Sequence, residues 1–130
     1  MPILVLTREP DAPIRTRWDS IVLGVGSRLT PNALLLPSDE AMIASVSRRP
    51  EAIGYISGSG NLTSVRTLTI NGESPAGIVR GRAYPLWQPV SVASSTPPPP
   101  IVASFITYVR SKQGQRIIAS LGYGQGGAGQ

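Results

Sequence analysis

Arginine dominates the residues of this 130-residue chain that could do chemistry. Lys and Arg together number 12 against 7 Asp and Glu, which gives a formal net charge of +5, and all but one of the 12 are Arg. A guanidinium offers a planar fork of hydrogen-bond donors that matches an oxyanion, and an excess of positive charge attracts anions in general. The sequence therefore favours anion binding as the chemistry to examine first.

Few residue types in this chain could support catalysis. The chain contains no Cys and no His, so a thiol nucleophile, an imidazole base, a disulfide framework and a zinc site with credible ligands are all excluded. Ser, Asp and Glu occur without a partner base, so a hydrolase would have no nucleophile–base pair. We therefore expect a protein that is not an enzyme and that uses neither a cofactor nor a metal.

Two further classes of partner are disfavoured. Arg80 and Arg82 beside Tyr84 are the candidate for interleaved basic and aromatic residues, but such a group is more typical of a solvated turn than of a nucleic-acid surface. No stretch approaches the roughly 20 apolar residues that span a bilayer. The apolar run Pro2–Leu6 has no basic segment before it, so we expect no secretory signal in this sequence.

Alternating strands and helices must position the charged residues. Ile3–Leu6 is a continuous apolar run that ends at Thr7 and Arg8, which predicts a strand buried on both faces. Pro13 suits the first position of a helix, and apolar residues then recur at helical spacing until Gly24. A short apolar strand is predicted next, over residues 33–36.

The clearest helix in the sequence comes directly after this strand. Ser38 is expected to cap its N-terminus, and Asp39 and Glu40 lie in its first turn, where the helix dipole favours negative charge. Pro50 ends it. Together with the strand before it, this helix indicates an α/β chain.

The second half is predicted to hold more strands and then helices. Strands are expected over 52–56, 65–70 and 86–93, with Asn71-Gly72 as a turn. The four prolines of Pro97–Pro100 predict a stiff, extended spacer. A helical stretch then continues to Leu121. We expect three parts: an α/β domain over 1–96, the proline spacer and C-terminal helices over 97–123, and a disordered Gly-rich tail over 124–130.

Several of these pieces occur together, in this order, in the periplasmic phosphate-binding proteins of ABC importers. The strand ending in Thr7-Arg8 resembles their crossover strand, and Gly122-Tyr123 resembles the segment after their last helices. Between these lie Ser38-Asp39-Glu40-Ala41-Met42, the typical strand Ala52-Ile53-Gly54-Tyr55, the start of a return strand at Tyr84-Pro85-Leu86, and Phe105 through Gln115.

The resemblance implies one lobe of a type II periplasmic-binding-protein fold, an α/β lobe with a mixed sheet flanked by helices. It covers only the second lobe and the C-terminal helices of that plan. Those helices normally pack on the lobe that has no counterpart here. The resemblance therefore implies a periplasmic or extracytoplasmic location and a partner that is either a complementary lobe or a second copy in a homodimer.

The same resemblance implies an oxyanion site. In the family the crossover strand ends in an arginine, and a serine-glycine-threonine turn four residues on opens the next helix. Arg8 stands at the arginine position, but Ala12, Pro13 and Ile14 replace the turn. Both hydroxyls and one amide donor are thereby lost. Arg15 matches an arginine that often follows the turn and could compensate in part.

Arg8, Ile14, Arg15 and Thr16 are the resulting candidate ligands for phosphate or another oxyanion. The competing interpretation is that the two arginines pair on the surface with Glu9, Asp11 or Asp19, since exposed Arg–carboxylate pairs are common.

Two other features allow a weaker functional interpretation. The amides of the loop Ser57-Gly58-Ser59-Gly60 could cradle a phosphate, but no Lys follows as a P-loop needs, so a flexible loop is favoured. Trp18 at helical spacing is expected in the core rather than as a ligand platform.

The residues leave two functions open. The first is a non-enzymatic, phosphate-binding-protein-like module that is truncated and carries an eroded anion site. The second is a protein–protein interaction or assembly module that no longer binds a small ligand. The eroded turn favours the second, and the basic charge favours the first.

Overall fold

The computed structural model describes residues 2–58, 61–76 and 84–124. The chain divides into two compact units, residues 1–68 and residues 69–130.

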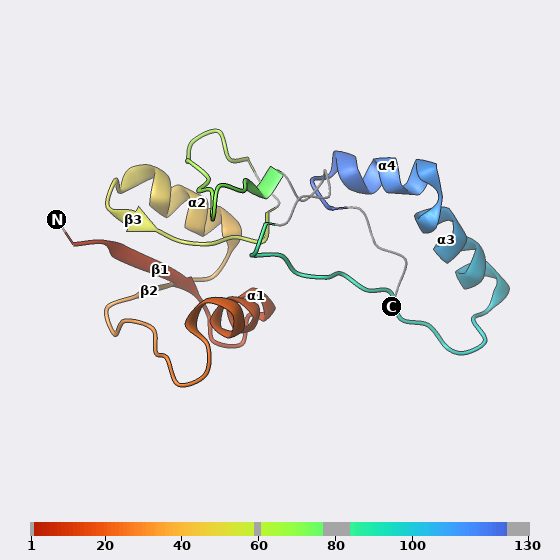
Figure 1. Cartoon of the computed structure of the whole chain (residues 1–130), viewed down its shortest axis with the longest axis horizontal. Coiled ribbons are helices and arrows are strands. Elements are labelled where there is room, and N and C mark those ends of the chain that lie inside the picture. The colour runs from red at the N-terminus through yellow and green to blue at the C-terminus, as the bar shows by residue number, and fades with distance from the viewer. Residues whose placement is uncertain (1, 59–60, 77–83, 125–130) are drawn as a thin grey trace. The chain divides into compact units, whose positions relative to one another are not determined.

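A three-stranded parallel sheet forms the centre of the first unit (Figure 1). Its strands are β1 (Leu4–Arg8), β2 (Leu34–Leu36) and β3 (Ala52–Ile53), in the order β2-β1-β3. Leu6 lies opposite Leu34, and Leu4 lies opposite Ala52. The central strand is the one that the sequence predicts to be buried on both faces.

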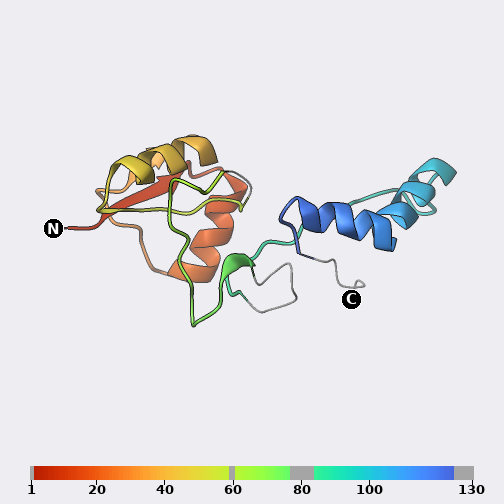
Figure 2. The ribbon, with the colours of Figure 1, turned by 90° about the horizontal axis from the view of Figure 1, so that it is seen from above.

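Helices cover both faces of this sheet. The helix α1 (Pro13–Trp18) follows β1 and continues as a π-helical segment, η1 (Asp19–Leu23), while α2 (Asp39–Arg48) connects β2 to β3. The first connection runs from β1 outward to β2, and the second runs back across β1 to β3. Because such crossovers are right-handed, the two helices must lie on opposite faces, as Figures 1 and 2 show.

Local sequence explains where these helices begin and end. Pro13 occupies the first turn of α1, as predicted, and the positive φ of Gly24 (69°) ends η1. The Ser38 hydroxyl accepts a hydrogen bond from the Ala41 amide at 3.1 Å, which confirms the predicted cap of α2.

The core of the first unit is small and close-packed. Leu6 and Met42 are each only 1% exposed, and the side chain of Thr7 is fully buried. Gly54 approaches them closely, because a Cβ at this position would overlap with the Met42 sulfur and touch the Leu6 side chain. The strand predicted over 52–56 is confined to Ala52–Ile53, so the chain leaves the sheet at this close approach.

The strand predicted over 65–70 is wrong, although the turn after it is right. Ile70 and Glu73 form a single antiparallel bridge, with N–O distances of 3.0 Å in both directions. Asn71 and Gly72 between them both have positive φ, as a tight turn of this kind requires. Pro75, two residues after Glu73, has no N–H that could extend the ladder of hydrogen bonds. The three named strands pair in parallel, so antiparallel pairing in the described ranges is limited to this bridge.

The strand predicted over 86–93 is also wrong. This segment is irregular, and Trp87, Val90 and Val92 are 53%, 80% and 63% exposed. Alternating β-branched residues favour a strand only when a neighbouring strand receives the hydrogen bonds. Within residues 84–99 the structure shows no strand, and Pro85 and Pro89 remove two of the donors that a ladder would need.

Two helices joined at a sharp corner complete the second unit. They are α3 (Pro100–Arg110) and α4 (Lys112–Ser120), and the Ser111 hydroxyl between them accepts a hydrogen bond from the Gly114 amide at 3.1 Å. Gly114 is buried because its backbone lies against the Tyr108 carbonyl at this corner. Pro100 is the first residue of α3, so only part of the predicted proline spacer lies outside a helix. Most of the predicted disordered tail, residues 125–130, lies outside the described residues.

Replacing Gly54 by alanine should destabilise the first unit by about 1–3 kcal/mol, because the new methyl group would displace the buried Met42 sulfur. Urea unfolding measures this change. In a Met42→Ala background the further cost of Gly54→Ala should shrink, since the obstructing sulfur is gone. Equal costs in the two backgrounds would contradict the close approach.

Candidate anion-binding site

The carboxyl edge of the sheet brings together segments that are distant in sequence. Arg8 is the last residue of β1, α2 begins just after β2, and Ser57 follows β3. The connections that leave β1 and enter β3 lie on opposite faces of the sheet, so this edge has a topological switch point between the two strands. Ligands of open α/β sheets bind at the carboxyl ends of strands at such points.

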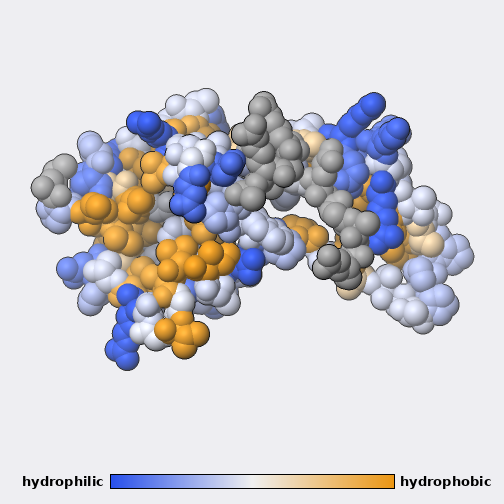
Figure 3. Space-filling model, viewed as in Figure 1, coloured by the Kyte–Doolittle hydropathy of each residue, from blue (hydrophilic) through white to orange (hydrophobic). Residues whose placement is uncertain are grey.

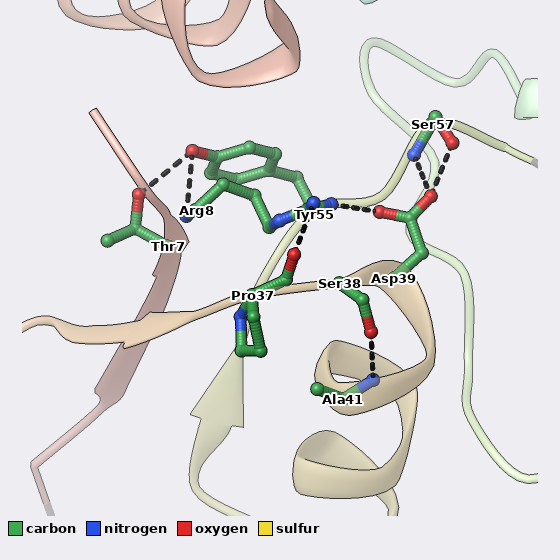
Figure 4. Close-up of polar contacts among 8 residues, drawn as sticks. All are labelled: Thr7, Arg8, Pro37, Ser38, Asp39, Ala41, Tyr55 and Ser57. Atoms are coloured by element: carbon green, nitrogen blue, oxygen red, sulfur yellow. Dashed lines mark hydrogen bonds and ion pairs between the residues drawn. The ribbon is translucent and has the colours of Figure 1, made fainter. Parts of the chain in front are cut away.

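The Arg8 guanidinium is held by the first residue of α2 and by Pro37, two residues before that helix (Figure 4). Its Nη1 contacts the Asp39 carboxylate at 2.5 Å, and its Nη2 donates to the Pro37 carbonyl at 2.9 Å. The side chain is 16% exposed. Its Nε is buried and has no hydrogen-bond partner among the described residues. Two of the three guanidinium nitrogens are therefore engaged within the protein.

Asp39 receives donors on both carboxylate oxygens. Oδ1 accepts from Arg8, and Oδ2 accepts from the Ser57 amide at 2.9 Å and from the Ser57 hydroxyl. The Asp39 side chain is 12% exposed. This one carboxylate thus ties the end of β1 to the start of α2 and to the segment after β3.

Arg15 is engaged by its own neighbourhood. Its Nε donates to Asp19 at 2.7 Å, and its Nη1 donates to the Arg8 carbonyl at 3.0 Å. The Arg15 side chain is 14% exposed. Its positive charge therefore lies close to the end of β1, where it also holds the backbone of Arg8 in place.

The start of α1 offers few free donors. The amides of Arg15 and Thr16 both donate to the Ala12 carbonyl, at 2.9 and 3.1 Å, and Pro13 has no N–H. Ile14 is left as the amide of this turn that could face an anion, and the Thr16 side chain is exposed. The candidate residues thus lie near one another, but their donors are sparse.

The ion pairing predicted from the sequence is partly right. Arg15 pairs with Asp19, as expected, in an i,i+4 arrangement. Arg8 pairs with Asp39 rather than with Glu9 or Asp11, because the parallel sheet places the start of α2 beside the end of β1. The sequence showed Asp39 only as an acidic residue favoured by the helix dipole. Its partner, 31 residues away, depends on the order of the strands.

Tyr55 fixes the end of β1 from the other side. Its hydroxyl lies 2.8 Å from the hydroxyl of buried Thr7, and it also accepts a hydrogen bond from the Arg8 amide at 3.3 Å. Its ring stacks on Trp18, with centroids 4.4 Å apart and planes inclined by 6°. Trp18 is half-buried and packs on Tyr55, so it lies outside the fully buried core in which it was expected.

Within the described part of the predicted loop Ser57–Gly60, Ser57 contacts the site. Both the amide and the hydroxyl of Ser57 are directed to Asp39. Residues 59–60 of the predicted loop lie outside the described residues, so the amide cradle considered for Ser57–Gly60 concerns Ser57 and Gly58 here.

The first turn of α2 stabilises negative charge. The pKa of the Glu40 carboxyl lies below its ordinary value, first because of a hydrogen bond from its own backbone N–H and then because of one from Ser38. Burial opposes this effect, and the positive charge of Arg8 adds to it. The start of α2 is therefore electrostatically favourable to carboxylates.

Neither a metal site nor a membrane span appears in the parts of the chain that the structure describes. No group of three or more acidic, His or Cys side chains gathers in them. None of their helices is both long enough and apolar enough to cross a membrane.

Sequence comparison identifies relatives that match part of the chain. No protein-family model matches it. Over 88 residues, or 66% of the chain, it is 35% identical to the phosphate-binding protein PstS 2 of Streptococcus pneumoniae, found in two strains of that species. The matched region spans 30% of those proteins.

Solved structures extend the match to nearly the whole chain. A phosphate-binding protein of a phosphate ABC transporter from S. pneumoniae matches 99% of the chain with a TM-score of 0.80 and 26% identity. A putative phosphate ABC transporter substrate-binding protein from Clostridium perfringens, solved with bound phosphate, matches 97% with a TM-score of 0.76 and 27% identity. A phosphate transport receptor from Vibrio cholerae, at 23% identity and a TM-score of 0.68, supports the fold alone.

The chain is thus similar, in sequence and in fold, to part of the phosphate-binding proteins of ABC transporters. This confirms the resemblance and the α/β, single-lobe fold expected from the sequence motifs. The chain spans about half the length of the solved proteins that it matches: 53% of the first two and 54% of the third.

The Tyr55 hydroxyl can be tested by Tyr55→Phe, which keeps the ring on Trp18 but leaves the buried Thr7 hydroxyl and the Arg8 amide without this partner. We expect a loss of about 1–3 kcal/mol in the free energy of unfolding. Adding Thr7→Val should cost less in the Tyr55→Phe background than in the wild type, because the orphaned hydroxyl is then absent. Additive losses would argue against the pair.

Proposed function

We propose that this chain is a non-enzymatic, oxyanion-binding module of the kind used by phosphate ABC importers, with a truncated plan and an eroded anion site. The observation that carries this proposal is the position of Arg8 at the carboxyl end of the central strand, at the switch point of a lobe whose solved neighbours are phosphate-binding proteins. An extracytoplasmic location and a transporter partner belong to the same proposal.

Four residues would contact the anion. Arg8 supplies the main positive charge, from a guanidinium whose two Nη nitrogens already donate to Asp39 and to the Pro37 carbonyl. Ile14 supplies a backbone amide at the start of α1. Arg15 adds positive charge beside the end of β1, and Thr16 adds an exposed hydroxyl one turn into α1.

The site is expected to be weak. Arg8 already donates to Asp39 and Pro37, and Arg15 already pairs with Asp19. A hydrogen bond to a charged group contributes roughly 1.5–3 kcal/mol, and about 1.4 kcal/mol changes an affinity tenfold. Losing the hydroxyls and one amide of the turn should therefore lower phosphate affinity by orders of magnitude relative to a complete cradle.

Phosphate should bind weakly and through Arg8. A titration of the wild-type protein with phosphate, followed by calorimetry and by the NMR shifts of the Arg8 and Ile14 amides, should show saturable binding that Arg8→Ala abolishes. Arg48→Ala removes the same charge from an exposed site at the end of α2 and should leave the binding intact. Sulfate serves as the comparison ligand.

Two results of that titration would contradict the proposal. Tight phosphate binding that depends on Arg8 would show that the site is not eroded. Absence of binding by any oxyanion would remove the ligand-binding function and leave the second candidate.

A second candidate function, assembly, has its own observation. Hydrophobic (orange) surface is exposed on each unit (Figure 3). In the second unit it includes side chains of α3 and α4 that a globular domain would normally bury. The large exposed side chains of these helices are Ile101 at 78%, Phe105 at 55%, Tyr108 at 45% and Ile117 at 48%. Because the chain spans about half of its solved neighbours, a complementary lobe or a second copy would cover this surface.

Self-association through these helices is measurable by light scattering and sedimentation. We expect a concentration-dependent dimer that Phe105→Asp disrupts, since a charge would then lie in an apolar contact. Val90→Asp places the same charge on an exposed residue outside the helices and should have little effect. A strictly monomeric wild-type chain would argue against a homodimer.

A further inference from the structure

The Asp39 carboxylate lies where a bound anion would be expected. It accepts three hydrogen bonds, from Arg8 Nη1 at 2.5 Å, from the Ser57 amide at 2.9 Å and from the Ser57 hydroxyl. A guanidinium, a backbone N–H and a hydroxyl are the donors that proteins use to hold oxyanions. In Figure 4 these donors converge on the carboxylate from two different segments of the chain.

The start of α2 does not need this carboxylate as a cap. Ser38 fills the N-cap position and accepts the hydrogen bond from Ala41. Asp39 is the next residue and directs its side chain away from the helix, toward Arg8 and Ser57 (Figure 4). The carboxylate of Asp39 therefore binds groups at the carboxyl edge of the sheet and does not cap the helix.

The donors around Asp39 have supports of their own. Arg8 Nη2 remains bound to the Pro37 carbonyl, and the backbone of Arg8 is held by Arg15 and Tyr55. The Ser57 amide belongs to the chain leaving β3. Removing the negative charge of Asp39 should therefore leave the donors close to their present positions, with their hydrogen bonds available.

We propose that Asp39 is an internal anion that occupies an oxyanion cradle formed by Arg8 and Ser57, and that its charge determines whether this edge of the sheet accepts an external oxyanion. An incoming inorganic oxyanion such as phosphate must either displace the carboxylate or bind beside a like charge, and both weaken binding. This inference rests on the proposed function, because it concerns the same Arg8. It adds Ser57 and the antagonist Asp39 to the site.

Asp39→Asn tests the inference. It removes the charge while keeping the size of the side chain, and it should tighten phosphate and sulfate binding roughly tenfold or more in the same calorimetric titration. Glu51→Gln makes the same change in net charge at the opposite, amino end of β3 and should leave the affinity within about twofold of the wild type, as screened distant charges do.

Two double variants locate the anion that Asp39→Asn admits. Adding Ser57→Ala should reverse a substantial part of the gain, because the cradle loses its hydroxyl donor, and adding Arg8→Ala should abolish binding. A gain in affinity that persists in full without the Ser57 hydroxyl would overturn the cradle, since the anion would then lie at the α1 turn.

The results separate this inference from the proposed function. Arg8-dependent binding by the wild type with no gain in Asp39→Asn overturns the inference and leaves the function standing. Binding by Asp39→Asn alone supports the inference and overturns the function for the native chain. Absence of binding in both overturns both.

A measurement on the wild type covers the case in which Asp39→Asn fails to fold. Carbon-detected NMR of the Asp39 carboxyl carbon, recorded during a phosphate titration, should show a shift that follows the same saturation curve as the Ser57 amide. Phosphate binding that shifts Arg8 and leaves both of these signals unchanged would overturn the proposal.

Discussion

The ion pair between Arg8 and Asp39 is the constraint on which the carboxyl edge of the sheet depends. It joins the end of the central strand to the helix that follows β2, and the hydrogen bonds from Ser57 bring in the segment after β3. With both side chains mostly buried, 16% and 12% exposed, the charges are less screened than at the surface. Removing one partner would leave the charge of the other unpaired in a partly dehydrated place, which is costly even where other contacts keep that side chain in position.

The anion site that we propose at this edge has an arginine in place but few donors around it. The guanidinium lies at the end of β1, Pro13 has no amide N–H to offer in the following turn, and the Ala12 carbonyl accepts hydrogen bonds from two other amides of that turn. Side chains of the chain itself, Asp39 and Asp19, neutralise the two arginines. The positive charge that the composition suggests for the site is therefore largely balanced locally.

The features of the fold that depend on neighbouring residues could be predicted from the sequence. The buried strand ending at Arg8, the proline that opens α1 and the Ser38 cap each follow from neighbouring residues. The partner of Arg8 could not be predicted in this way, because it requires the strand order that brings α2 beside β1. The predictions of strands over 65–70 and 86–93 were wrong for a related reason. Alternating apolar and polar residues favour a strand, but a strand forms only where a neighbouring strand receives its hydrogen bonds.

Tyr55 links the end of β1 to the ring of Trp18. One end of its side chain, the ring, lies flat on Trp18, and the other end, the hydroxyl, touches Thr7 and the amide of Arg8. A displacement of the strand end would therefore tilt or slide one ring over the other. Once the second tryptophan, Trp87, is replaced, the indole emission of Trp18 thus gives the first unit an optical sensor of its own, positioned to report motion at the arginine without any added label.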